Sequence, residues 1–193
     1  MRPVKAIIDF FMDILETVVF IGSLFIVVYL FIMQPNQVKG ESMVPTFQNA
    51  DYILTSKITY KFRNYKRGDV VVFKSPKNPE IDYIKRIIGL PGDKILFKGS
   101  NVYINDSLLS ESYISAPNNL WDNGYAKEGE TIVVPDNYVF VMGDNRPHSS
   151  DSREFGPIPI TDIIGHVFYR YFPANQVGVI KNPLSLNTKT LSF

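Results

Sequence analysis

A long uncharged stretch near the N-terminus constrains this chain more than any other feature of its sequence. No charged residue occurs from Thr17 to Val38, and Val18–Met33 is almost wholly apolar. An α-helix rises about 1.5 Å per residue, so this core is slightly short for a ~30 Å hydrocarbon layer unless flanking residues extend it. We therefore predict a transmembrane anchor over residues 17–35, preceded by an amphipathic lead-in over residues 1–16.

Two alternatives compete with the anchor, namely a cleaved signal peptide and a buried helix of a soluble protein. The apolar run ends in the sequence MQPN, at 33–36, and lacks the small residues of a signal peptide cleavage site. Arg2 and Lys5 precede the span, whereas the first basic residue after it is Lys39. This asymmetry gives a small preference for a cytoplasmic N-terminus.

Composition narrows the chemistry that the chain can perform. Its 193 residues suffice for one domain and an anchor, and a net charge of +1 gives no sign of a nucleic-acid partner. The absence of cysteine removes disulfides, thiolate nucleophiles and cysteine metal sites. The two histidines, His148 and His166, lack metal-ligand spacing, so we expect no metal and no cofactor. A Ser-His-Asp triad using His148 stays possible, and otherwise lysine or a carboxylate must serve as the base.

Beyond Pro35 the pattern indicates β-structure, and we predict a catalytic domain over residues 36–180. Short runs rich in Val, Ile, Phe and Tyr alternate with Gly, Pro, Asn and Asp. We expect a mainly β fold, an antiparallel barrel-like or coiled sheet behind one helix, with a loop or small insert at 106–130 and a loose tail at 181–193. The predicted strands are 37–40, 52–56, 69–74, 81–89, 94–98, 101–105, 131–134, 138–142 and 163–172, with a tight hairpin at Gly99-Ser100.

Four polar or glycine-bounded stretches carry the candidate chemistry. In the first, Gly40 and Pro45 flank Ser42, which indicates an irregular turn with an available hydroxyl. In another, Lys85 lies in an apolar β-prone run, where burial would favour its neutral amine. The stretches are GESMVPT (40–46), RGDVVVF (67–73), YIKRIIGLPGD (83–93) and GDNRPHSSDSR (143–153). Together and in this order, from Val38 to Gly165, they resemble the conserved boxes of the type I signal peptidases.

This resemblance implies a membrane-bound serine endopeptidase that removes signal peptides from secreted preproteins. Ser42 would be the nucleophile and Lys85 the general base, acting through an acyl-enzyme, and Ser149 would orient the lysine amine. Asp144, Asp151 and Arg153 match supporting residues, whereas His148 falls at a variable position. The family cuts after small residues, and the positions matching its pocket walls are Val38, Met43, Tyr83 and Ile84.

The resemblance also implies a single-pass protein of the cell membrane whose catalytic domain is extracytoplasmic, with membrane lipid and preproteins as partners. Some members place a serine two positions before the nucleophile as an oxyanion donor, but this chain has Gly40 there. A backbone or water donor would replace it, and we expect Gly40→Ser to be tolerated. Two other functions stay open: a self-cleaving repressor-type Ser-Lys protease, and a catalytically dead membrane-tethered binding module.

Overall fold

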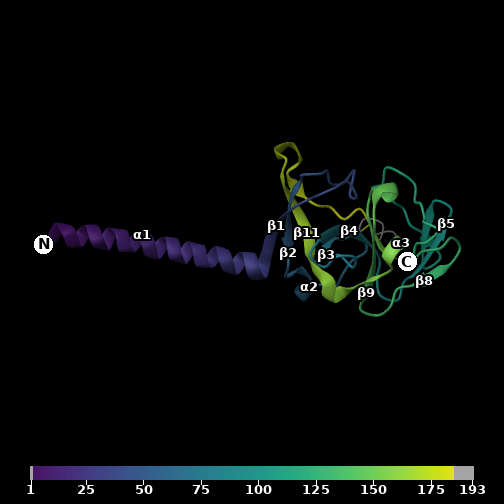
Figure 1. Ribbon diagram of the computed structural model, residues 1–193, viewed down its shortest axis with the longest axis horizontal. Coiled ribbons are helices and arrows are strands. Elements are labelled where there is room, and N and C mark those ends of the chain that lie inside the picture. The colour runs from purple at the N-terminus through teal and green to yellow at the C-terminus, as the bar shows by residue number, and fades with distance from the viewer. Residues whose placement is uncertain (1, 185–193) are drawn as a thin grey trace, which may run out of the picture.

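The computed structural model describes residues 2–184 and contains a β-rich body with one long helix projecting from it (Figure 1). Helix α1 covers Arg2–Val27 and continues as a π-helical segment, η1, over Val28–Ile32. The apolar window covers Val4–Ile32, and none of it is buried against the rest of the structure. The predicted lead-in and the predicted anchor therefore lie in one continuous helical segment.

The larger sheet carries most of the body and is antiparallel throughout its pairings. Its order is β1-β2-β11-β3-β4-β9-β10, with β12 paired to β11, and it curls into a half barrel. The strands are β1 Met33–Gln37, β2 Tyr52–Ser56, β3 Val70–Lys74, β4 Asp82–Gly89, β9 Tyr138–Met142, β10 Ile158–Pro159, β11 Ile163–Phe172 and β12 Gly178–Val179.

A smaller antiparallel sheet, of order β7-β6-β5-β8, forms the side of the body distant from α1 (Figure 1). The hairpin predicted at Gly99-Ser100 is confirmed, because Lys98 pairs with Asn101. Among residues 2–184, the remaining helical elements are one turn long or less. The strands are β5 Lys94–Lys98, β6 Asn101–Ile104, β7 Ser107–Leu108 and β8 Thr131–Val133; the helices are α2 Thr59–Phe62, η2 Arg146–His148, α3 Ser152–Phe155, η3 Ile160–Asp162 and η4 Ala174–Gln176.

Apolar side chains cover both faces of the central strands, which explains why their sequences run apolar without alternation. On β3, Val70 and Val72 join a cluster with Met43 and Phe47. The opposite face of the same strand directs its side chains, among them Val71, into a second cluster with residues of β4 and β9. A strand buried on both faces loses the polar half of the period-2 pattern. This double burial makes the middle of the sheet a rigid platform.

The mainly β fold class is confirmed, and the differences lie at strand ends and in the shortest strands. β1 begins at Met33 and ends at Gln37, earlier than the predicted 37–40, because it pairs with β2 from Met33↔Ser56 onward. The sequence did not indicate β7, β10 or β12, each of which has two residues. Strands this short make too little pattern to be read locally.

The predicted tail at 181–193 starts too early. Asn182 Nδ2 donates to the carbonyl oxygen of Arg67 at 2.9 Å, and Leu184 packs against the core cluster around Phe97 and Phe140. The chain is therefore docked on the body as far as residue 184. The rest of the predicted tail, 185–193, lies outside the described residues.

Candidate active site

Ser42 lies on an irregular turn, residues 40–47, that follows β1; we call this segment the Ser42 turn. Gly40 has a φ of +88°, in the left-handed region that favours glycine. A serine at this position would be strained even though the space around it is open. This finding replaces the expectation that Gly40→Ser is tolerated. The backbone N–H of Ser42 donates to no acceptor in the described part of the chain and remains available to a ligand.

Lys85 reaches Ser42 from the middle of β4. Its Nζ lies 2.7 Å from Ser42 Oγ and donates to the carbonyl oxygen of Ile84 at 3.0 Å. The ring of Tyr83, from the same strand, lies 5.1 Å from Nζ. Only 4% of Lys85 is exposed. Burial penalises the ammonium and lowers the pKa of Lys85 from 10.5 to about 8, although the nearby carboxylates of Asp151 and Asp144 act in the opposite direction.

The segment between β9 and α3, residues 143–151, forms the back of the site; we call it the Ser149 loop. Asn145 ties it to the Ser42 turn, because its N–H donates to Ser42 O at 3.0 Å and its Nδ2 to Glu41 O at 3.1 Å. A Cβ placed on Gly143 would lie 2.2 Å from Ser149 Oγ and 2.4 Å from Ser42 O. Only a glycine fits there, so the two segments approach each other through this position.

Ser149 is 2% exposed, and its Oγ has no hydrogen-bond partner within residues 2–184. The hydrogen bond between Ser149 and Lys85 that the family resemblance implies is therefore not formed in this structure. A buried hydroxyl without a partner is costly, so such a group commonly marks a functional position or a bond formed in another state. Lys85 has a third N–H position that neither Ser42 nor Ile84 occupies.

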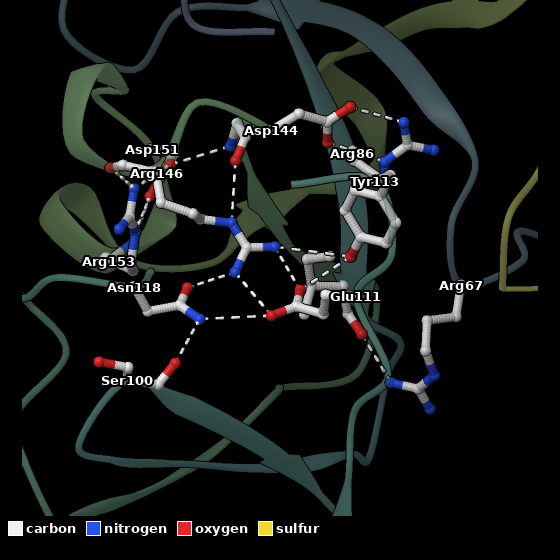
Figure 2. A network of polar contacts seen from close by, with 12 residues as sticks. Arg67, Arg86, Ser100, Glu111, Tyr113, Asn118, Asp144, Arg146, Asp151 and Arg153 are labelled. Atoms are coloured by element: carbon white, nitrogen blue, oxygen red, sulfur yellow. Dashed lines mark hydrogen bonds and ion pairs between the residues drawn. The ribbon is translucent and has the colours of Figure 1, made fainter. Parts of the chain in front are cut away.

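Two buried ion pairs hold the elements around the site. Arg86, next to Lys85 on β4, donates from Nε and Nη2 to both carboxylate oxygens of Asp144, at 2.8 and 2.6 Å. Arg153 donates to both oxygens of Asp151 in the same bidentate way, at 2.9 and 2.8 Å. Asp151 also accepts from Gly143 N–H at 2.9 Å. These pairs, visible in Figure 2, join β4 to the Ser149 loop and the loop to α3.

Sequence reasoning named Arg153 but missed the other two buried arginines, Arg86 and Arg146, together with the partners of Arg146. Arg146 is fully buried in the Ser149 loop and forms an ion pair with Glu111, from the predicted insert. Tyr113 and Asn118, also from the insert, contact the same guanidinium (Figure 2). Glu111 stands alone between irregular residues, and no local pattern pointed to it.

A cleft of about 560 Å³ leads to Ser42 and Lys85. The predicted pocket residues Val38, Tyr83 and Ile84 line it. Met43 does not: it is 1% exposed and packs in the core cluster beneath the turn, because the turn directs its side chain inward. His148 lies on the rim of the cleft.

His166 lies outside the cleft and has a structural environment. Its ring packs edge-on against Tyr60, and its Nε2 lies 3.8 Å from Asp69 Oδ1. Burial lowers the pKa of His166 below its usual value. Ser42 and Lys85 both line the cleft, and within the described residues they form a hydrogen bond between a hydroxyl and a basic nitrogen.

Comparison with known proteins places the chain in a family. Residues 11–172 match the family described as signal peptidase, peptidase S26. The chain is 38% identical over 155 residues to a probable signal peptidase I-2 of Synechocystis sp., a match covering 78% of this chain and 68% of that protein. It is 34% identical over 191 residues to signal peptidase IB of Staphylococcus aureus (strain MRSA252), covering 89% of this chain and 96% of that protein.

A solved structure, a signal peptidase I from Enterococcus faecalis V583, is 33% identical to this chain. The structural match covers 54% of this chain and 97% of the Enterococcus chain, with a TM-score of 0.45. The family match and the two relatives confirm the resemblance seen in the sequence. The chain therefore belongs to the signal peptidase family, peptidase S26, and is a type I signal peptidase.

Proposed function

We propose that this protein removes signal peptides from preproteins by a Ser42–Lys85 dyad. The observation that carries the proposal is the 2.7 Å contact between Lys85 Nζ and Ser42 Oγ at the end of a cleft. A serine hydroxyl needs a base, and a lysine acts as one only when its amine is neutral. The lowered pKa of Lys85, about 8, supports this role, because a substantial share of the amine is neutral near pH 8.

The proposed reaction starts when the lone pair of Lys85 takes the proton of Ser42 while Oγ attacks the scissile carbonyl carbon. The Ile84 carbonyl accepts one of the two remaining N–H groups. Ser149 Oγ would accept the other once its side chain rotates toward Lys85, which would also give this buried hydroxyl a partner. Lys85 then protonates the leaving amine as the acyl-enzyme forms. The Lys85 amine, neutral again, then takes a proton from a water molecule whose oxygen attacks the acyl carbon. The bond between this carbon and Ser42 Oγ breaks, Lys85 returns the proton to Oγ, and the cleaved signal peptide leaves with a free carboxylate.

The backbone N–H of Ser42 would stabilise the oxyanion of the tetrahedral intermediate. It has no acceptor among the described residues, and it belongs to the nucleophile itself, as in other serine hydrolases. With glycine at position 40, no side-chain donor is available from that residue. Asp144, Asp151 and Arg153 act by holding the Ser149 loop through their buried ion pairs.

The proposed substrate is an extended preprotein segment with small side chains at the first and third positions before the cut. The cleft runs beside β1 and β4, where an extended peptide would add backbone hydrogen bonds. Val38, Tyr83 and Ile84 are the proposed walls of the side-chain pockets. The preference for small residues follows from the resemblance to the family.

We further propose that α1 and η1 anchor the protein in the cell membrane, with the N-terminus cytoplasmic and residues 36–180 outside. The apolar side chains of Val4–Ile32 are exposed on every side of the helix, an arrangement that water does not favour and lipid does. Arg2 and Lys5 at one end agree with this orientation.

The experiment is cleavage of a purified preprotein by the full-length protein in detergent, followed by N-terminal sequencing of the product. We expect one cut, after a small residue, by the wild type, and none by Ser42→Ala or Lys85→Ala. Cleavage within the protein's own chain only would support the repressor-type protease, and preprotein binding without cleavage would support the binding module. Cleavage that persists in Ser42→Ala would overturn the dyad.

A further inference from the structure

We infer that the insert, residues 106–130, is a strap that positions the Ser149 loop, and that Glu111 is its positioning residue. This inference rests on the proposed function, because it assigns the insert a role in presenting Ser149 to Lys85. The insert lines no part of the cleft in the described structure, so it acts through contacts behind the site. Figure 2 shows its side chains, Glu111, Tyr113 and Asn118, converging on the guanidinium of Arg146.

The strap accepts the N–H groups at both Nη atoms of the Arg146 guanidinium. Arginine has five N–H donors, and Arg146 Nε donates to the carbonyl oxygen of Gly143, within the same loop, at 3.0 Å. The four donors of Nη1 and Nη2 contact the insert: Nη1 donates to Glu111 Oε2 at 2.8 Å and to Asn118 Oδ1, and Nη2 donates to Glu111 Oε1 and Tyr113 OH. The remainder of the Ser149 loop therefore supplies Arg146 with one bond only.

The partners of Arg146 are themselves locked. Tyr113 OH donates to Glu111 Oε1 at 2.8 Å, and Asn118 Nδ2 donates to Ser100 O, beyond β5, at 2.9 Å. The Tyr113 ring lies 4.4 Å from the guanidinium carbon of Arg86, the residue next to Lys85. The same strap thus contacts the strand that carries Lys85 and the loop that carries Ser149.

The charges make Glu111 the decisive member. Arg86, Arg146 and Arg153 are buried, and each needs a carboxylate, because an unpaired buried charge is strongly unfavourable. Asp144 and Asp151 serve Arg86 and Arg153 from within residues 143–153. Of the three arginines, Arg146 is the one whose carboxylate partner lies outside this stretch: it pairs with Glu111, which is 35 residues away in sequence. Loss of Glu111 would release Arg146, and with it the segment between Gly143 and Ser149.

The test compares Glu111→Gln with Glu130→Gln in the full-length protein. Both variants remove one carboxylate from the insert, but Glu130 is exposed and its side chain makes no hydrogen bond or ion pair within residues 2–184. We expect Glu111→Gln to lower kcat by about 10²-fold, with KM nearly unchanged, because a displacement of about 1 Å at a reacting group has this effect. Glu130→Gln should match the wild type. Tyr113→Phe removes one hydroxyl from the strap and should lower kcat by a smaller factor.

Hydrogen exchange measured by mass spectrometry supplies the readout that a merely structural role would not change. In Glu111→Gln, amides of residues 143–151 should exchange faster, while those of β3 and β4 stay protected. Unchanged kcat together with unchanged exchange in the loop would overturn the strap. If Glu111→Gln does not fold, the same two measurements on Tyr113→Phe decide.

Failure of the strap and failure of the dyad are distinguishable. A wild type that cleaves preprotein, with an inactive Ser42→Ala, keeps the dyad whatever the Glu111 variants show. Ser149→Ala gives the largest fall in kcat that displacement of the Ser149 loop alone should cause. If Glu111→Gln lowers kcat much more than Ser149→Ala does, Glu111 acts on more than this loop, and the proposed role would be overturned.

Discussion

At the scale of single residues, Lys85, the proposed base, is the position where the proposed function and stability oppose each other. A base must lose its proton near the working pH, and burial achieves this by penalising the ammonium. The surrounding carboxylates of Asp144 and Asp151 would favour the ammonium, but each is already paired with an arginine. The ion pairs therefore keep these carboxylates from cancelling the desolvation of Lys85, whose pKa falls to about 8.

The first prediction concerns the pH dependence of cleavage. Since the neutral amine of Lys85 is the active form, kcat/KM should rise with pH through about 8 and become flat above it. Lys85→Arg should be inactive across the range, because guanidinium keeps its proton. The measurement is the cleavage rate of a soluble peptide at a series of pH values. Activity in Lys85→Arg with a rising limb near 6.5, the usual pKa of histidine, would point to His148 instead.

The second prediction concerns the stability cost of the same lysine. The pKa of Lys85 is about 8 in the folded state against 10.5 in a model compound, so the unfolded chain binds more protons between these values and stability rises with pH across that window. The penalty is fully present below about pH 8 and is lost above 10.5. The difference between the two pKa values corresponds to a penalty of about 3 kcal/mol in the free energy of unfolding.

Lys85→Met should therefore be inactive but more stable than the wild type at pH 7, with the gain shrinking toward pH 10.5. Urea unfolding followed by circular dichroism at the two pH values measures the difference. Lys98→Met, at an exposed position on β5, serves as the control and should change stability little at either pH. A destabilised Lys85→Met at pH 7 would mean that burial of the ammonium costs less than the hydrogen bonds of Lys85 contribute.

At the scale of elements, the site forms where two irregular segments, the Ser42 turn and the Ser149 loop, meet above β4. Neither segment has the regular hydrogen bonds of a strand, so each depends on the other. Asn145 joins them by two hydrogen bonds to backbone oxygens of the Ser42 turn. Gly143 lets them approach at a distance that no Cβ would allow. Catalytic geometry here is a property of the contact between segments.

The third prediction follows from that contact. Gly143→Ala would place a methyl group within 2.2 Å of Ser149 Oγ and 2.4 Å of Ser42 O, so one of the two segments must move. We expect a fall in kcat of about 10²-fold or more, because reacting groups tolerate little displacement. Peptide cleavage by the purified variant measures it. Gly178→Ala, where a Cβ meets nothing within 4 Å, is the matched control and should retain activity.

At the scale of the whole molecule, the N-terminal apolar helix, which is the proposed anchor, and the body are joined by a strand and not by a flexible linker. β1 follows η1 immediately and pairs with β2 from Met33↔Ser56 to Gln37↔Tyr52. Lys57, just after β2, donates from Nζ to the carbonyl oxygens of Tyr29 and Leu30, within η1. The first residues after the apolar span are therefore part of the larger sheet.

The fourth prediction concerns where the anchor can be removed. A protein lacking residues 1–32 keeps β1 and should fold, cleave a soluble peptide, and cleave a membrane-inserted preprotein more slowly than the full-length protein does. A protein lacking residues 1–35 loses three of the five residues of β1 and leaves the edge of β2 open, so its unfolding midpoint should be lower. Thermal melts and both cleavage assays make the comparison. If the protein lacking residues 1–35 is as stable as the protein lacking residues 1–32, β1 contributes nothing to the stability of the body.

Local sequence patterns were sufficient for much of this protein. The uncharged run marked the apolar helix, and the alternation of β-prone runs with turn residues located β2, β5, β9 and β11 at their observed bounds. Four motifs in order indicated the family and singled out Ser42 and Lys85. These features are readable because each depends on neighbouring residues: side-chain periodicity, turn chemistry and the length of an apolar segment.

The tertiary structure alone decided which distant residues meet. Strand order and register bring Lys85 to Ser42, 43 residues away in sequence. They also bring Glu111 to Arg146, although nothing in the irregular insert marks Glu111. Met43 belongs to a motif but turns into the core, because the backbone of the Ser42 turn and not the residue type sets its direction. Such contacts depend on topology and packing, and a local pattern records neither.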